Sequence, residues 1–165
     1  MREFVENMGR IDPPAGAASM TLDYEQRCRG RFLVLLDDGT EAGVVLPHAS
    51  RRLAGGDVLR TAGNETAVIR CRLEDLSWAE APDWPTLAKA AYHFGNRHAA
   101  LQFEGLRLRF QPDSALERLA AGLGLATGRE MAVFDPEPGA AGGGGHVHAG
   151  GIHGWNDSPS GQAGW

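Results

Sequence analysis

The chain has 165 residues, with 21 acidic and 16 basic side chains, and its formal net charge is −5 at pH 7. A chain of this length can bury one medium core or two small ones. The negative charge argues against nucleic acid as a partner, since phosphate backbones attract clustered Lys and Arg. The sequence has no apolar run of the roughly 20 residues that a membrane span needs. It also has no N-terminal signal segment, and we expect a cytoplasmic protein that does not bind membranes.

The first part of the chain has the pattern of a small all-β domain. Strands are expected around residues 4–5, 31–36, 41–46, 58–59 and 67–69. The second and third of these runs flank Asp-Asp-Gly-Thr, and Asp-Gly between two apolar, β-rich runs is a strong hairpin signal. Short strands at this spacing indicate a sandwich or barrel, which we place at residues 1–71. We found no second potential ligand near His48 and interpret it as a surface histidine.

From residue 72 onward helices alternate with strands, so a second domain is placed at residues 72–138. Strands are expected around residues 76–78, 99–103, 106–110 and 130–134. One helix is expected to start at Asp83 and stop at Gly95. The other is expected to start at Ser114, with Glu117 at capping-box spacing, and to stop at Gly124. The order βαββαβ is that of the ferredoxin-like fold, and the predicted class of the whole chain is α+β.

His98 lies between the first of these helices and the strand that follows it. Gly95 is expected to take the left-handed backbone of a helix C-terminus. Leu101 and Phe103 alternate with polar residues, as in a half-buried strand. This alternation places His98 on the opposite face, away from the core, where it is either solvated or offered to a ligand. His93, on the fringe of the helix face, is interpreted as structural.

Residues 139–165 are rich in glycine and contain three of the six histidines, which are His146, His148 and His153. Such a segment cannot bury enough apolar surface to offset its chain entropy, so it is predicted to be disordered. A flexible tail with His-x-His can close onto a metal held elsewhere. The alternative is a solubilising tail with incidental histidines. Cys28 and Cys71 lack a Cys-x-x-Cys neighbour and are expected to be reduced, small core residues.

Tyr-His-Phe-Gly-Asn-Arg-His at residues 92–98, followed by Leu-Gln at 101–102, resembles the signature of the urease nickel metallochaperone family, UreE. Leu-Asp-Asp-Gly at 36–39, Gly-Asp-Val-Leu at 56–59 and Phe-Asp-Pro-Glu at 134–137 resemble the same family in matching order. The resemblance implies an N-terminal β domain of the partner- or peptide-binding type and a ferredoxin-like domain through which two chains pair.

The resemblance also implies a metal site and a route of delivery. Nickel is expected at the homodimer interface, bound by His98 of each chain with help from His146, His148 and His153. Delivery is expected to run through the GTPase UreG to the urease apoprotein and its accessory complex. Some members have His-x-His where this chain has Pro-Asp-Ser at residues 112–114. We therefore expect the accessory metal site there to be missing. Many members also end in a dense histidine tract, whereas this tail has three histidines, so we expect delivery rather than storage to be the role.

Imidazole suits Ni(II), Cu(II) and Zn(II), so copper or zinc can compete with nickel as cargo. The sequence offers no nucleophile, no paired carboxylates and no oxyanion donors, so we expect no enzyme active site. A metal-dependent hydrolase would need an acidic or cysteine ligand beside His98. The remaining alternative is a scaffold that binds a partner through the β domain, with no metal and an inert tail.

Overall fold

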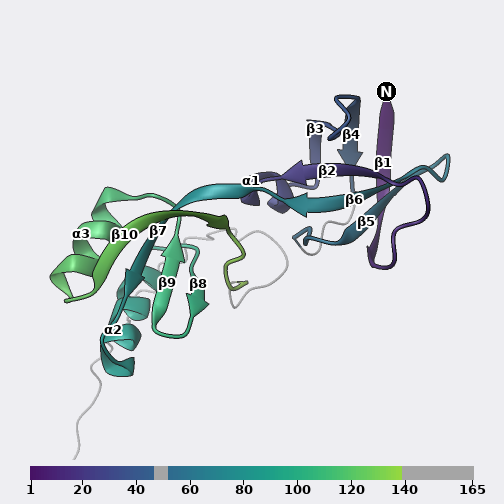
Figure 1. Ribbon diagram of the computed structural model, residues 1–165. Helices are drawn as coiled ribbons and strands as arrows, with labels where there is room; N and C mark the ends of the chain where they lie inside the picture. The colour runs from purple at the N-terminus through teal and green to yellow at the C-terminus, as the bar shows by residue number, and fades with distance from the viewer. Residues whose placement is uncertain (47–51, 139–165) are drawn as a thin grey trace, which may run out of the picture.

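The computed structural model describes residues 1–46 and 52–138 (Figure 1). These residues form a six-stranded and a four-stranded sheet, each with its own hydrophobic core. Figure 1 shows the sheets at opposite ends of an elongated molecule, joined where the chain passes from β6 (Thr66–Cys71) into β7 (Leu73–Glu80). The predicted α+β class is confirmed. His48 and the predicted glycine-rich tail lie outside the described residues.

The N-terminal sheet has the strand order β2-β6-β5-β1-β4-β3. Its other strands are β1 (Arg2–Arg10), β2 (Ala18–Leu22), β3 (Arg31–Leu35), β4 (Glu41–Val45) and β5 (Asp57–Thr61). The predicted hairpin of β3 and β4 is confirmed, and Gly39 in its turn has φ of +83°. The two edges of the sheet meet, because the Asp37 N–H donates to the Ser19 carbonyl at 2.9 Å. Phe4, Val44 and Leu59 are fully buried inside.

Two elements of this region were not predicted, strand β2 and helix α1 (Tyr24–Cys28). The helix begins with a capping box in which Asp23 and Gln26 bond each other's backbone N–H groups. It is short, and the one residue that it buries is Arg27 rather than an apolar side chain, so apolar periodicity gave no signal. The expectation that both cysteines are core residues is wrong. Cys28 is exposed, Cys71 is half-buried, and both are free thiols.

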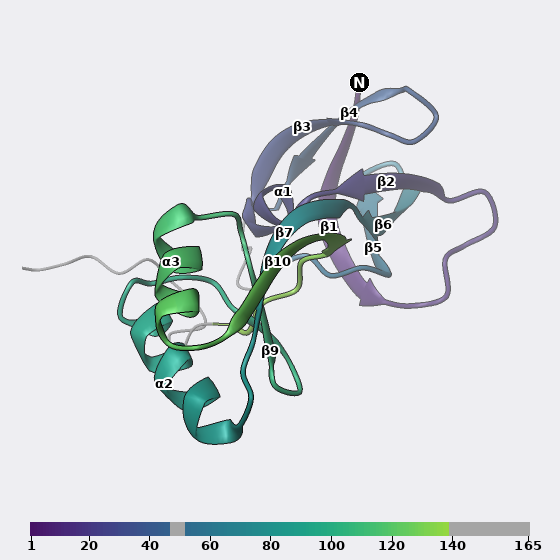
Figure 2. The ribbon, with the colours of Figure 1, turned by 60° about the vertical axis from the view of Figure 1, so that its left-hand side comes forward.

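The C-terminal sheet has the order β10-β7-β9-β8, and every neighbouring pair is antiparallel. Its elements after β7 are α2 (Trp84–Gly95), β8 (Gln102–Glu104), β9 (Arg107–Phe110), α3 (Ser114–Gly122) and β10 (Ala126–Val133). This is the predicted ferredoxin-like arrangement. Figure 2 shows both helices on one face of the sheet. The core lies between them and the sheet, with Phe94 of α2 edge-on to Phe110 of β9.

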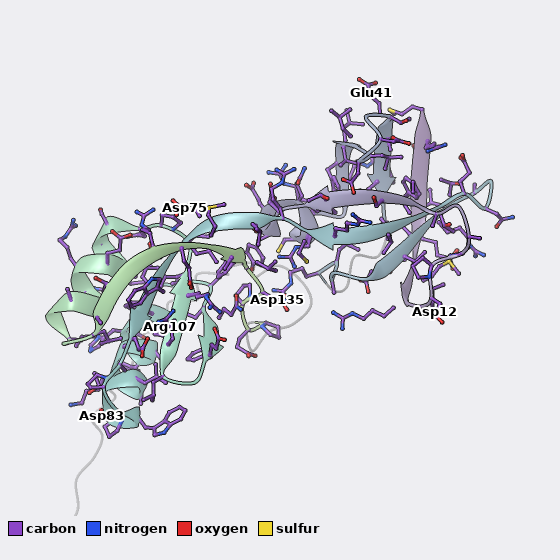
Figure 3. The ribbon with its side chains drawn as sticks, viewed as in Figure 1. Asp12, Glu41, Asp75, Asp83, Arg107 and Asp135 are labelled. Atoms are coloured by element: carbon purple, nitrogen blue, oxygen red, sulfur yellow. The ribbon has the colours of Figure 1, made fainter. Side chains whose placement is uncertain are left out.

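The other face of this sheet is polar and its charges are paired. Arg107, labelled in Figure 3, bonds Glu80 through two nitrogens at 3.0 and 2.6 Å. The same guanidinium lies 4.4 Å from the centre of the Trp78 ring. A face built of internally compensated charges is adapted to water rather than to an apolar partner. In the described part of the chain no helix has the length and apolar character of a membrane span.

Candidate metal-binding site at the end of helix α2

Helix α2, which leads to His98, begins as the sequence predicts. Asp83 is its N-cap, and the Asp83 carboxylate accepts the Thr86 N–H at 2.8 Å. Pro85 lies in the first turn, where a missing N–H has no cost. The hydrogen bonds from Thr86 lower the pKa of Asp83 below its ordinary value. Leu87, Ala90 and Phe94 form the buried face that fixes the helix against the sheet.

The C-terminus of α2 is closed by two reversed hydrogen bonds that together form a Schellman motif. The Ala99 N–H donates to the Phe94 carbonyl at 3.3 Å, and the His98 N–H donates to the Gly95 carbonyl at 2.9 Å. This motif needs one residue in the left-handed region, and that residue is His98, with φ of +55°. The prediction that Gly95 takes this conformation is wrong, since Gly95 is still helical. Glycine is the usual residue at this position of the motif, and this chain has histidine there.

His98 is exposed, as predicted, but the predicted reason is wrong. The strand that was expected to carry it from residue 99 starts only at Gln102. Phe103 shares the helix-covered face with Leu108, yet it is 42% exposed because β8 is the outer strand of the sheet. Strand alternation therefore does not orient His98. Its exposure follows from the left-handed turn that ends α2.

His98 opens onto a pocket of about 380 Å³ between the end of α2 and the start of α3. Asp113 lines the same pocket, and its Oδ1 accepts the N–H groups of Ala115 at 2.7 Å and Leu116 at 3.0 Å. The N-cap of α3 is therefore Asp113, not Ser114 as predicted. Glu117, predicted to complete a capping box, instead accepts the Ser77 hydroxyl at 2.6 Å.

His98 does not belong to a complete metal site within the described residues. No group of three or more His, Cys, Asp or Glu side chains there could hold a metal ion. His93 is half-buried on α2, and its carbonyl accepts Arg97 Nη1 at 3.0 Å, so Arg97 folds back over the helix end. One imidazole on a rigid turn can contribute to a transition-metal site but cannot complete one. The other predicted ligands, His146, His148 and His153, lie outside the described residues.

The path of the last described residues was not predicted. After β10 the chain crosses to the segment that follows His98. There the Asp135 N–H donates to Gln102 Oε1 at 2.9 Å and the Glu137 N–H donates to the Leu101 carbonyl at 2.8 Å. The last described residues thus lie beside the segment that follows His98. No local pattern could have signalled this, because the bonded residues are more than 30 positions apart.

Family models match both parts of the chain. The N-terminal domain of the UreE urease accessory protein matches residues 1–72, and its C-terminal domain matches residues 74–160. The chain belongs to the UreE family. The urease accessory protein UreE of Alteromonas mediterranea is 40% identical over 130 residues, which are 79% of this chain and 84% of the relative. UreE of one Pseudomonas putida strain is 42% identical over 123 residues, which are 74% and 76% of the two chains.

Proposed function

We propose that this protein is a metallochaperone that delivers Ni(II) during urease maturation and is not itself an enzyme. In the proposed site, His98 from each chain of a homodimer binds one nickel ion, with help from His146, His148 and His153. The observation that carries the proposal is His98 itself, an exposed imidazole in a left-handed backbone at a helix end. Non-glycine residues in this conformation cost about 1–2 kcal/mol. A residue retained against such a cost points to a functional use of its side chain.

Pairing of two chains supplies the second fixed imidazole. In a two-fold dimer each surface residue meets its own copy, so one histidine near the axis provides two ligands. Helix α2 has an unpaired apolar stripe at Trp84, Ala88 and Tyr92, with Trp84 65% and Tyr92 66% exposed. These positions recur every four residues along one face of the helix. The stripe ends in the turn before His98, which supports pairing through this side of the domain.

Two imidazoles held by the fold and further ligands from a tail suit a carrier. The fixed pair selects metals that prefer nitrogen, which are nickel, copper and zinc. The remaining positions, filled by residues of the tail or by water, can be exchanged when an acceptor offers its own ligands. Because metal-bound imidazole must be neutral, and histidine ordinarily titrates near pH 6.5, the nickel should leave as the solution is acidified through about that pH.

We assign partner contacts to an N-terminal domain at residues 1–71, with the metal-binding and dimerisation domain at residues 72–138. The support is an apolar patch over strands β3 and β4. Met1 is 81% exposed, Leu33 73% and Leu35 61%, and a methyl group at Gly43 would touch both Leu33 and Met1 at 3.8 Å. Exposed apolar side chains that cluster mark interaction surfaces. The proposed partners are the cytoplasmic GTPase UreG and the urease apoprotein with its accessory complex.

The same patch favours the second candidate function, an adaptor that binds a partner without metal. Calorimetric titration of metal-free, untagged, full-length protein with Ni(II), with molecular mass measured in solution, separates the two. The carrier predicts one tight nickel per dimer, lost in His98→Ala and retained in the matched variant His93→Ala. A parent protein that binds no nickel, or a His98→Ala variant with the parent's affinity, would reject the interface site.

A further inference from the structure

We propose that Arg27 and Arg52 are positioning residues for the metal site, because they hold the root of the histidine-bearing tail against the loop that carries His98. The root is defined as residues 134–137. The proposal rests on the proposed function, in that it assumes a ligand role for the tail. It adds two residues of the N-terminal region, far from His98 in sequence, to the machinery that binds the metal.

Arg27 holds the root from helix α1. Its side chain is only 1% exposed, its Nη2 donates to the Phe134 carbonyl, and its Nη1 lies 3.6 Å from Asp135 Oδ1. Its Nε and Nη1 have no hydrogen-bond partner within the described part of the chain. Burying a guanidinium this incompletely satisfied is costly. Its guanidinium also lies 5.8 Å from the centre of the Tyr24 ring. The hydrogen bond and the ion pair of this side chain are both with the root, which supports fixing the root as its role.

Arg52 holds the root from the other side. Its Nη2 bonds Asp135 Oδ1 at 2.6 Å and its Nη1 bonds the Pro136 carbonyl at 3.0 Å. The guanidinium also lies 5.4 Å from the centre of the Tyr24 ring, which meets the Phe134 ring edge-on at 4.9 Å. The N-terminal region thus contacts a backbone carbonyl, the carboxylate and the aromatic ring of the root. Figure 3 shows Asp135 where the two parts of the molecule meet.

The far side of the root is fixed to the metal-site loop by the bonds of Asp135 to Gln102 and of Glu137 to Leu101. β10, which the root leaves, and β8, which it reaches, are opposite edges of the four-stranded sheet. Three strand spacings separate these edges, a distance of about 14 Å. The contacts of Arg27 and Arg52 with the root are called the clamp below. The root, held by this clamp, carries the last described residues from one edge of the domain to the other, to the segment that follows His98.

The position of the root matters because a tethered ligand acts through its effective concentration. His146 is nine residues beyond Glu137, so it reaches at most about 30 Å from the root. Effective concentration falls as the tether lengthens or as its origin moves away from the site. Release of the root would add four residues to the tether and return its origin to β10. We expect nickel affinity to fall by about three- to tenfold.

The test uses the full-length chain and Ni(II) alone. Arg52→Gln removes the exposed half of the clamp and leaves Asp135 beside buried Arg27, so the fold should be retained. Asp135→Asn removes the carboxylate charge that faces both arginines, so urea unfolding of this variant is measured beside nickel binding. Arg60→Gln is the matched control, because it breaks a comparable pair with Glu6, at 3.0 Å, elsewhere in the N-terminal region. Both clamp variants should weaken nickel binding, and combining them should weaken it little further, since they break the same contact. The control should bind as the parent does.

A second background isolates the tail. With His146, His148 and His153 all replaced by Asn, Arg52→Gln should no longer change nickel affinity, because the root then positions no ligand. Amide hydrogen exchange gives a readout without metal. The Asp135 and Glu137 amides should lose protection in Arg52→Gln and keep it in Arg60→Gln.

The measurements distinguish a failure of the clamp proposal from a failure of the proposed function. If the parent binds nickel through His98 but Arg52→Gln binds as tightly as Arg60→Gln, the clamp has no positioning role and the proposed function stands. Equal weakening with and without the tail histidines would also overturn the inference, since the effect would then not pass through the tail. If the parent binds no nickel, the proposed function and the inference fall together.

Discussion

Helices α2 and α3 of the same domain end in the same backbone motif with different residues at its critical position. At the end of α3 the Leu125 N–H bonds the Ala120 carbonyl at 3.1 Å and the Gly124 N–H bonds the Ala121 carbonyl at 3.0 Å. Gly124 takes the left-handed conformation there, with φ of +85°. The end of α2 repeats this pair of bonds, with His98 in the place of Gly124.

The difference shows what each end is for. Gly124 precedes Leu125, which is 5% exposed and belongs to the core, so the turn after α3 only has to return the chain to the sheet. Glycine does this without steric cost. At the end of α2 the same turn holds an exposed imidazole at the mouth of a pocket. Glycine would form this turn as well as histidine does, so we attribute the presence of histidine to a use of its imidazole ring.

His98→Gly should have the largest effect. It separates the role of the imidazole in binding nickel from the role of the residue in closing helix α2. His98→Gly should lower nickel affinity by more than the roughly 10–100-fold that the loss of an outer-shell partner costs. The same change should leave the fold intact and raise the free energy of unfolding by up to about 1 kcal/mol, because glycine relieves the left-handed strain. Nickel titration and urea unfolding of the metal-free protein measure the two effects.

His98→Asn is the matched variant, since asparagine tolerates the left-handed region better than most residues but lacks the imidazole. It should lose nickel with little change in stability. A destabilised His98→Gly protein would mean that the imidazole supports the fold, and the contrast between the two helix ends would then be one of packing.

The reverse exchange tests whether the site is more than a histidine at a helix end. Gly124→His should lower the free energy of unfolding by about 1–2 kcal/mol, the cost of placing a side chain in the left-handed region. It should add no tight nickel site, because Gly124 precedes the start of β10, whereas the root of the tail follows the other end of that strand. A gain of one tight nickel per chain would show that position in the fold is unimportant.

Much of this domain could be predicted from the sequence, because its signals are local. Asp83 and Pro85 mark the start of α2, and the order of elements gives the ferredoxin-like topology. The spacing of apolar residues predicts a face of Leu87, Ala91 and Phe94, and the structure buries Ala90 in place of Ala91. The start of α3 was misplaced by one residue because Asp113 and Ser114 are both good caps, and only Asp113 bonds the helix N–H groups.

The end of α2 shows where local rules fail. Gly95 is a reasonable stop signal, but the helix continues through it and closes on His98, at a position where glycine is the usual residue. Such departures are expected at functional sites, where local preference is overruled. The clamp on the root of the tail could not be predicted from the sequence for another reason. Arg27 and Phe134 are 107 positions apart, and nothing in either segment indicates the contact.

The smallest expected effect concerns the beginnings of the helices, which both use an aspartate as N-cap and so differ less than their ends. The pKa of Asp83 is lowered by its hydrogen bonds from Thr86. A carboxyl whose pKa is lower in the folded state stabilises the fold above its unfolded pKa, which is about 3.9. That contribution is lost as the pH falls below about 4 and through the folded-state value.

Asp83→Asn keeps a good cap that cannot titrate. The urea midpoint of this variant should therefore lie slightly below that of the parent at pH 7 and approach it at pH 3. Asp12→Asn, an exposed change outside any helix, is the control for the loss of one carboxylate. An Asp83→Asn protein that loses as much stability in acid as the parent would show that the cap of α2 does not act through its charge.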